Sequence, residues 1–141
     1  MADLQRFVDA QAGVFEDAVA EIRSGRKAGH WMWFVFPQLA GLGRSETSRF
    51  YAIASLDEAR EYLDHPVLGP RLRDAAAATL TAPTHVSAEA IFGPIDARKL
   101  RSSMTLFRRA QPAEPVFSGV LSRFYGGRTD EATERLLAPG R

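Results

Sequence analysis

The stretch that most constrains the fold is WMWFVF at 31–36, where six large apolar side chains follow one another. On a helix these side chains would cover every side, so the helix would need burial all round. On a strand they would divide between two faces, and both faces would need cover. The stretch must therefore lie near the centre of the molecule in either conformation. It is either the segment around which the core packs or the wall of a pocket.

Most of the remaining chain carries the periodicity of helices rather than strands. Apolar residues recur at helical spacing over 4–22, with an interruption expected at Gly13. Ser55 and Glu58 form a capping-box pattern that predicts a helix start, and that helix should end before Pro66. Further helices are expected from about Pro70, from a cap at Asp96, over 117–124 and from 129–131. The sequence therefore predicts an all-α protein, a compact helical array of about five to seven helices.

Composition agrees with one ordinary globular domain, which we expect to span residues 1–141. Hydrophobic residues make up 45% of the chain and charged residues 25%. Because 18 basic residues face 17 acidic ones, there is no strong electrostatic attraction to nucleic acid or to a membrane surface. We therefore expect neither as a partner.

Several kinds of chemistry and location are not supported by the sequence. Cysteine is absent, which excludes thiol nucleophiles, disulfides and cysteine-ligated zinc. The three histidines show no HExxH spacing, so no metal site and no cofactor is predicted. The longest apolar run is far too short to span a bilayer, and the N-terminus lacks the pattern of a secretory signal. We expect a cytoplasmic protein.

Polar residues flank the aromatic stretch. His30 precedes it and Gln38 follows it closely, and such a mixture of apolar surface with a few polar groups is typical of small-molecule sites. The indole N–H groups of Trp31 and Trp33 need partners when buried, which points to acceptors or a wet cavity nearby. His30 is also the one histidine whose apolar neighbours can tune its pKa, so it is the candidate general acid–base.

The segment GLGRSETSRFY at 41–51 combines glycines with hydroxyl groups and a guanidinium. Such groups suit phosphate or carboxylate, especially if a helix starts near Ser45. The GxxxxGK[ST] pattern of a P-loop is absent, so the alternative is a flexible connection that ends in an ordinary helix cap.

The helix expected over 96–109 has two different faces. At about 100° per residue, one arc holds Leu100, Ser103, Met104 and Phe107. The arc turned away from it holds Arg98, Arg101, Arg108 and Arg109. Lys99 lies one turn from Ser103 at the border between the arcs, beside Ser102. Its ammonium either reaches water or points into a pocket.

Five motifs together resemble a known family over nearly the whole chain. They are HWMWFVFPQ at 30–38, GLGRSETSRFYAI at 41–53, EAREYLDHPVLGPRL at 58–72, IFGPIDARKLRSSMTLF at 91–107 and FYGG at 124–127. In these motifs the chain resembles the bacterial family of domain of unknown function 1810, which implies a compact helical array and no inherited activity. Some members carry the label calpastatin, which we regard as a mistaken transfer because the calpain inhibitor is disordered.

The resemblance also singles out polar positions that packing alone does not require. They are His30, Gln38, Ser45, Ser48, Tyr51, Lys99, Ser102 and Ser103. A fainter likeness in motif order links the chain to YbiA-like proteins, which are associated with NAD and ADP-ribose derivatives. That likeness is an analogy at the level of motif order.

These observations support two hypotheses of different classes. The first is a ligand-binding domain, with or without enzymatic activity, for a small anionic or nucleotide-derived molecule such as an NAD- or ADP-ribose-like compound. Its pocket would be walled by Trp31, Trp33 and Phe36, with the polar positions above as contacts and His30 as acid–base. The second is a protein-interaction module whose arginine face meets an acidic partner. The two differ in whether Lys99, His30 and Gln38 converge on one concave space.

Overall fold

The protein is a bundle of short helices, as seen in a computed structural model that describes residues 3–138. Those residues form ten helices: α1 (Gln5–Gln11), α2 (Phe15–Ser24), α3 (Met32–Val35), α4 (Glu46–Phe50), α5 (Leu56–Asp64), α6 (Leu68–Thr79), α7 (Ala88–Phe92), α8 (Pro94–Ala110), α9 (Pro115–Tyr125) and α10 (Glu131–Leu137). The all-α class is confirmed. The ends of the expected domain, residues 1–2 and 139–141, lie outside the described residues.

The number of helices exceeds the five to seven expected. The excess comes from α3, α4 and α7, which have only four or five residues each. A helix this short does not complete two turns, so it leaves no apolar periodicity in the sequence. Among the described residues, the segments before and after α4 form one isolated parallel β-bridge, between Leu39 and Ile53.

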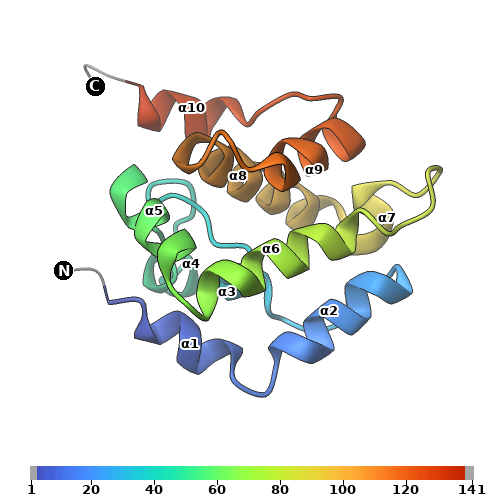
Figure 1. The fold of residues 1–141 in the computed structure, drawn as a ribbon, viewed down its shortest axis with the longest axis horizontal. Coiled ribbons are helices and arrows are strands. Elements are labelled where there is room, and N and C mark those ends of the chain that lie inside the picture. Colours follow the sequence, from blue (N-terminus) through green and yellow to red (C-terminus); the bar gives the residue numbers. More distant parts are fainter. Residues whose placement is uncertain (1–2, 139–141) are drawn as a thin grey trace.

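The longest helix, α8, is the centre of the arrangement. It packs against α5, α7, α9 and α10, while α6 lies between α2 and α9 and also contacts α5 (Figure 1). The apolar arc expected for α8 is buried, including Leu100, Met104 and Phe107. One continuous core therefore joins the elements, and α8 contributes much of it.

The aromatic stretch is a single helical turn with its flanking residues. Trp31, Met32, Val35 and Phe36 are buried, and the rings of Trp31 and Phe36 both meet Phe92 edge-on. Trp33 and Phe34 remain partly exposed. The stretch is central, as its composition requires, and one side of the turn is left to border the surface.

Several helix ends follow the sequence signals. Gly13 has a φ of 74° between α1 and α2, and Gly25 ends α2 in the left-handed conformation. The Ser55 hydroxyl accepts a hydrogen bond from the Glu58 N–H at 3.1 Å, as the capping box predicts. The cap expected at Asp96 is wrong: α8 begins at Pro94 with Gly93 as its N-cap. Proline is favoured at the first helical position because it has no N–H to leave unpaired.

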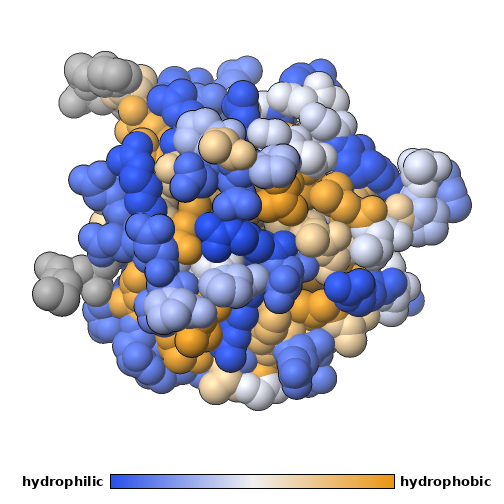
Figure 2. Space-filling model, viewed as in Figure 1, coloured by the Kyte–Doolittle hydropathy of each residue, from blue (hydrophilic) through white to orange (hydrophobic). Residues whose placement is uncertain are grey.

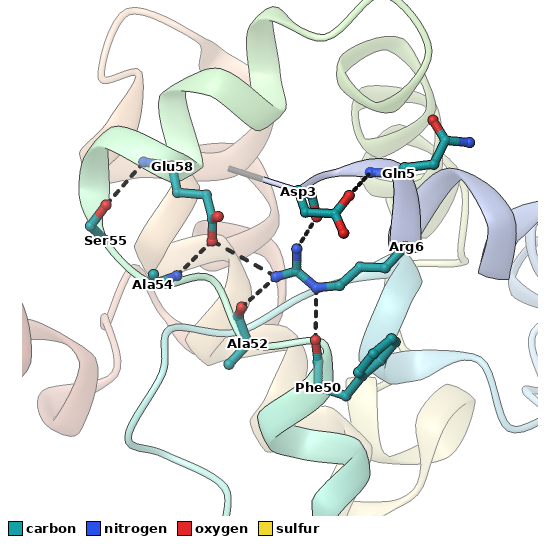
Figure 3. Close-up of polar contacts among 8 residues, drawn as sticks. All are labelled: Asp3, Gln5, Arg6, Phe50, Ala52, Ala54, Ser55 and Glu58. Atoms are coloured by element: carbon teal, nitrogen blue, oxygen red, sulfur yellow. Dashed lines mark hydrogen bonds and ion pairs between the residues drawn. The ribbon is translucent and has the colours of Figure 1, made fainter. Parts of the chain in front are cut away.

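A partly buried arginine, Arg6, fastens α1 to the segment between α4 and α5 (Figure 3). The Arg6 guanidinium donates to the carbonyl oxygens of Phe50 at 2.7 Å and Ala52 at 2.8 Å. It also lies 3.9 Å from the carboxylate of Glu58, which accepts the Ala54 N–H at 2.7 Å. The Glu58 carboxylate thus accepts the N–H of Ala54, just before the N-cap of α5, and also pairs with the Arg6 guanidinium. This clamp sets the path of the chain as it leaves α4.

The surface exposes a few large apolar residues, among them Phe50 and Ile95. Figure 2 shows hydrophilic side chains over much of one face, with hydrophobic side chains in separate patches. Within residues 3–138, no helix combines the length and the apolarity needed to cross a bilayer.

Candidate functional site

Two adjoining hollows lie at the first turns of α8. The first, here called the aromatic hollow, has a volume of about 320 Å³. It is lined by Lys27, His30, Trp33, Phe92, Gly93, Pro94, Ile95 and Asp96. The second, here called the polar hollow, has a volume of about 270 Å³. It is lined by Gln38, Leu42, Gly43, Ser48, Ile95, Arg98, Lys99, Ser102, Asp130 and Ala132.

Ile95 belongs to both hollows and forms the ridge between them. This residue is 70% exposed. The contact between Lys99 and Trp33 also joins the hollows, because Lys99 lines the polar hollow and its ammonium lies 4.3 Å from the centre of the Trp33 ring. The two hollows therefore meet at a boundary formed by Ile95 and by the contact between Lys99 and Trp33.

Two lysines share one carboxylate at this boundary. The Asp96 carboxylate lies 2.9 Å from the Lys27 ammonium and 3.4 Å from the Lys99 ammonium. The Lys27 ammonium also lies 5.0 Å from the centre of the Trp31 ring. The Lys27 ammonium also lies near enough to the Glu21 carboxylate to lower the pKa of that group, so the two ammonium groups face two carboxylates. The boundary therefore carries no excess charge, and hydrogen-bond donors decide what it can bind.

The polar hollow holds hydrogen-bond donors that no protein group uses. Among residues 3–138, neither the Arg98 guanidinium nor the Gln38 side-chain amide has a hydrogen-bond or ion-pair partner. The Ser48 hydroxyl accepts a hydrogen bond from Ser45 at 2.9 Å, and its own proton remains available. Asp130 is the one acidic residue in the lining, and its carboxylate caps α10. The hollow therefore presents donors to whatever enters it.

The loop before α4 shapes one side of the polar hollow. The Ser45 hydroxyl caps α4 by accepting the Ser48 N–H at 3.1 Å, so the helix start expected near Ser45 is confirmed. A Cβ atom on Gly43 would stand 2.4 Å from the Cβ of Ser48, so only glycine fits there. This close approach places the Ser48 hydroxyl at the lining.

Glu21 on α2 holds the loop that presents His30. One oxygen of its carboxylate accepts hydrogen bonds from Ala28 N–H at 2.7 Å, Gly29 N–H at 2.9 Å and Trp31 Nε1–H at 2.9 Å. Partial burial raises the pKa of Glu21, but these donors and the Lys27 ammonium together lower the pKa below its usual value. The carboxylate is thus held in its charged form, and the loop is fixed by it.

The structure brings together six of the residues singled out in the sequence. His30 and Trp33 line the aromatic hollow, while Gln38, Ser48, Lys99 and Ser102 line the polar hollow. The other positions lie elsewhere. Trp31, Phe36 and Ser103 are buried in the core, Ser45 caps α4 at the surface, and Tyr51 packs among Phe7, Phe34 and Phe50. The pocket wall expected from Trp31 and Phe36 is supplied instead by Trp33 and Phe92.

Other lining residues were not singled out in the sequence. Phe92 ends α7, and Pro94 and Ile95 open α8 after Gly93, a Gly-Pro helix start that is visible in the sequence. Lys27 carries no signal of its own, because its place depends on the hydrogen bond from its N–H to the Ile91 carbonyl at 2.7 Å. That contact joins segments far apart in the chain.

Comparisons with known proteins agree with this fold. A family model described as "Protein of unknown function (DUF1810)" matches residues 1–137. The chain belongs to this family. It is also similar to the crystal structure of the conserved hypothetical protein Rv1873 from Mycobacterium tuberculosis, with a TM-score of 0.93 and 52% identity. That match covers 96% of each chain. No curated protein matches.

In this DUF1810 protein, His30 is exposed, and its imidazole has no hydrogen-bond partner among residues 3–138. A general base is normally oriented by a neighbouring acceptor or donor. Asp96 lines the same hollow, but its carboxylate is shared by Lys27 and Lys99. Within the described part of the chain, no group of three or more acidic or histidine side chains is placed to hold a metal ion. The geometry fits a ligand contact better than an assembled acid–base pair.

The arginine face of α8 is partly used within this DUF1810 protein. Arg101 donates to the Thr129 carbonyl at 2.6 Å, and Arg109 pairs with Glu134 at 3.2 Å. The other two, Arg98 and Arg108, are exposed and have no such partner among residues 3–138. The four arginines therefore do not form one uncommitted basic surface.

Proposed function

We propose that this DUF1810 protein binds a small organic anion in the joined hollows beside Trp33 and Lys99. The observation that supports the proposal is the set of uncommitted donors in the polar hollow: the Arg98 guanidinium, the Gln38 amide and the Ser48 hydroxyl. The Lys99 ammonium adds a charged hydrogen-bond donor at the same place. Donors of these types prefer phosphate and carboxylate oxygens.

The size and lining of the hollows suit a small molecule. Ligand sites commonly enclose roughly 300 to 1,000 Å³ and combine apolar walls with a few well-placed polar groups. The aromatic hollow, at about 320 Å³, lies at the low end of that range, and the polar hollow, at about 270 Å³, lies just below it. The proposal requires binding alone. If the bound molecule is also transformed, His30 is the candidate acid–base, and hydrolysis or group transfer needs no cofactor there.

Thermal unfolding in the presence of anions tests the proposal. The panel contains inorganic phosphate, pyrophosphate, citrate, sugar phosphates and nucleotides. A ligand at about 100 times its dissociation constant adds about 2.7 kcal/mol to the stability, which raises the Tm of a domain of this size by roughly 8 to 13 °C. We expect at least one anion to produce a shift of this order.

Two arginine variants make the test specific. Arg98→Ala removes a donor from the polar hollow and should reduce the shift strongly. Arg108→Ala removes an exposed arginine from the same helix outside both hollows and should leave the shift unchanged. The proposal fails if no anion raises the Tm, or if the two variants respond alike.

A further inference from the structure

The aromatic hollow has the chemistry of a site for a planar ring. Trp33, Phe92, Pro94 and Ile95 supply apolar walls on a space of about 320 Å³. At its edge, the Asp96 carboxylate retains lone pairs beyond those used by the two lysines, because an ionised carboxylate offers about four acceptor positions. A nucleobase combines apolar faces with N–H groups along its edge, and such faces stack on aromatic side chains.

The polar hollow has a different chemistry. Among the described residues, no aromatic side chain lines it, and its donors are a guanidinium, an ammonium, an amide and the Ser48 hydroxyl. The Ser102 hydroxyl also lies in this lining, but it donates to the Arg98 carbonyl at 3.2 Å. This lining suits a phosphate group. It offers no aromatic ring on which a second base could stack.

The boundary between the hollows links the two kinds of group. The Lys99 ammonium lies against the Trp33 ring at 4.3 Å, on the polar side of the boundary. The ridge residue Ile95 lines both hollows and is 70% exposed. A molecule that occupies both hollows would cover this ridge with its middle part, and a sugar fits there between a base and a phosphate.

Resting on the proposed function, we infer that the ligand is a nucleotide with one base. The base occupies the aromatic hollow and the phosphate occupies the polar hollow. A molecule with two bases, such as a dinucleotide, would leave its second base outside both hollows. The ligand class is therefore a nucleoside monophosphate or a larger molecule built on one.

Equilibrium binding to the full chain tests this inference. The probes are AMP, GMP, CMP and UMP, the corresponding nucleosides, ribose 5-phosphate and inorganic phosphate. We expect the best nucleotide to bind at least roughly 10-fold more tightly than its nucleoside or ribose 5-phosphate, because each half fills only one hollow. The chain contains two tryptophans, and Trp31 is buried, so quenching of fluorescence by the nucleoside reports on Trp33.

Variants assign each half of the ligand to a hollow. Arg98→Ala should weaken the nucleotide roughly 10-fold and leave the nucleoside unchanged. Trp33→Leu should weaken nucleotide and nucleoside alike and leave ribose 5-phosphate unchanged. If Trp33→Leu does not fold, His30→Ala at the exposed edge of the aromatic hollow replaces it, because its effect is expected on the nucleoside and not on ribose 5-phosphate.

Failure of this inference is distinguishable from failure of the proposed function. If ribose 5-phosphate or inorganic phosphate binds as tightly as every nucleotide and depends on Arg98, the anion site stands and the nucleotide is ruled out. If nucleosides bind as tightly as nucleotides in wild type and in Arg98→Ala, the polar hollow does not bind phosphate and both ideas fail. If none of these probes and no anion of the panel binds, both ideas fail as well.

Discussion

Replacing Glu21 tests whether one carboxylate holds the loop that presents His30. The carboxylate accepts three N–H groups at 2.7 to 2.9 Å, one of them from the Trp31 indole. Trp31 is only 2% exposed, and a buried donor that loses its partner costs about 1–3 kcal/mol. The backbone donors of Ala28 and Gly29 lie nearer to solvent and add about 1 kcal/mol together. Glu21→Ala should therefore destabilise the protein by about 2–4 kcal/mol.

Glu21→Gln separates the charge from the hydrogen bonds. The glutamine keeps an acceptor oxygen but loses the negative charge, so we expect a smaller cost of about 1–2 kcal/mol near pH 7. Because the pKa of Glu21 is lowered in the folded protein, its charge stabilises the fold above the unfolded pKa, which is about 4.5. That stabilisation is lost as the pH falls through the folded pKa. The difference between wild type and Glu21→Gln should therefore shrink below about pH 4.

Urea unfolding monitored by tryptophan fluorescence measures these differences, at pH 7 and in steps down to pH 3. The matched control is Glu61→Gln, since Glu61 on α5 is exposed and has no hydrogen-bond or ion-pair partner among residues 3–138. Its unfolding free energy should stay within about 0.5 kcal/mol of wild type. If Glu21→Ala falls in that same range, or if the gap to Glu21→Gln is constant in acid, the carboxylate does not hold the loop.

Four further substitutions have expected outcomes that calorimetric unfolding can check. Gly43→Ala should lower the unfolding free energy by about 1–3 kcal/mol and weaken anion binding, because its Cβ would stand 2.4 Å from that of Ser48. In contrast, Gly119→Ala inside α9 should raise the unfolding free energy by about 0.5–1 kcal/mol. Arg6→Ala should cost about 2–4 kcal/mol by leaving two carbonyls of the clamp in Figure 3 without their donor, and a change below about 0.5 kcal/mol would contradict this role. Ser103→Ala should be neutral or stabilising by up to about 1 kcal/mol, because the buried hydroxyl has no partner among the described residues, and a clear loss of stability would show that it has one.

The parts of the fold that could be predicted are those decided by residues close together in the sequence. The cap at Ser55, the left-handed glycine at Gly25 and the break at Gly13 each act within a few positions of the chain. Helix α3 could not be assigned, because a single turn of large apolar residues fits a helix or a strand equally well until its surroundings are known. The start of α8 was misplaced by three residues because a proline at the first position outcompeted the cap expected at Asp96.

The candidate site divides in the same way. Lys99 and Gln38 were singled out as polar residues beside apolar ones, and the structure places both in the polar hollow, where their role in binding stays a prediction. The sequence did not distinguish the roles of Trp31 and Trp33. In the structure, Trp31 is in the core and donates to Glu21, whereas Trp33 lines the aromatic hollow beside the start of α8. Which side of a short turn faces a hollow is decided by helices from distant parts of the chain. No pattern within the turn records it.

The position of α8 has a consequence for how the whole molecule responds to a guest. Its first turns form both hollows, and its later turns lie at the middle of the core, against α5, α9 and α10. Amide protons that exchange with solvent only when the entire chain opens are protected in proportion to its global stability. A molecule seated at the start of this helix would slow all of them by the same factor, including those on the far side. A bound molecule would thus lower the exchange rates of these amides throughout the polypeptide, and not only of the amides next to the two hollows.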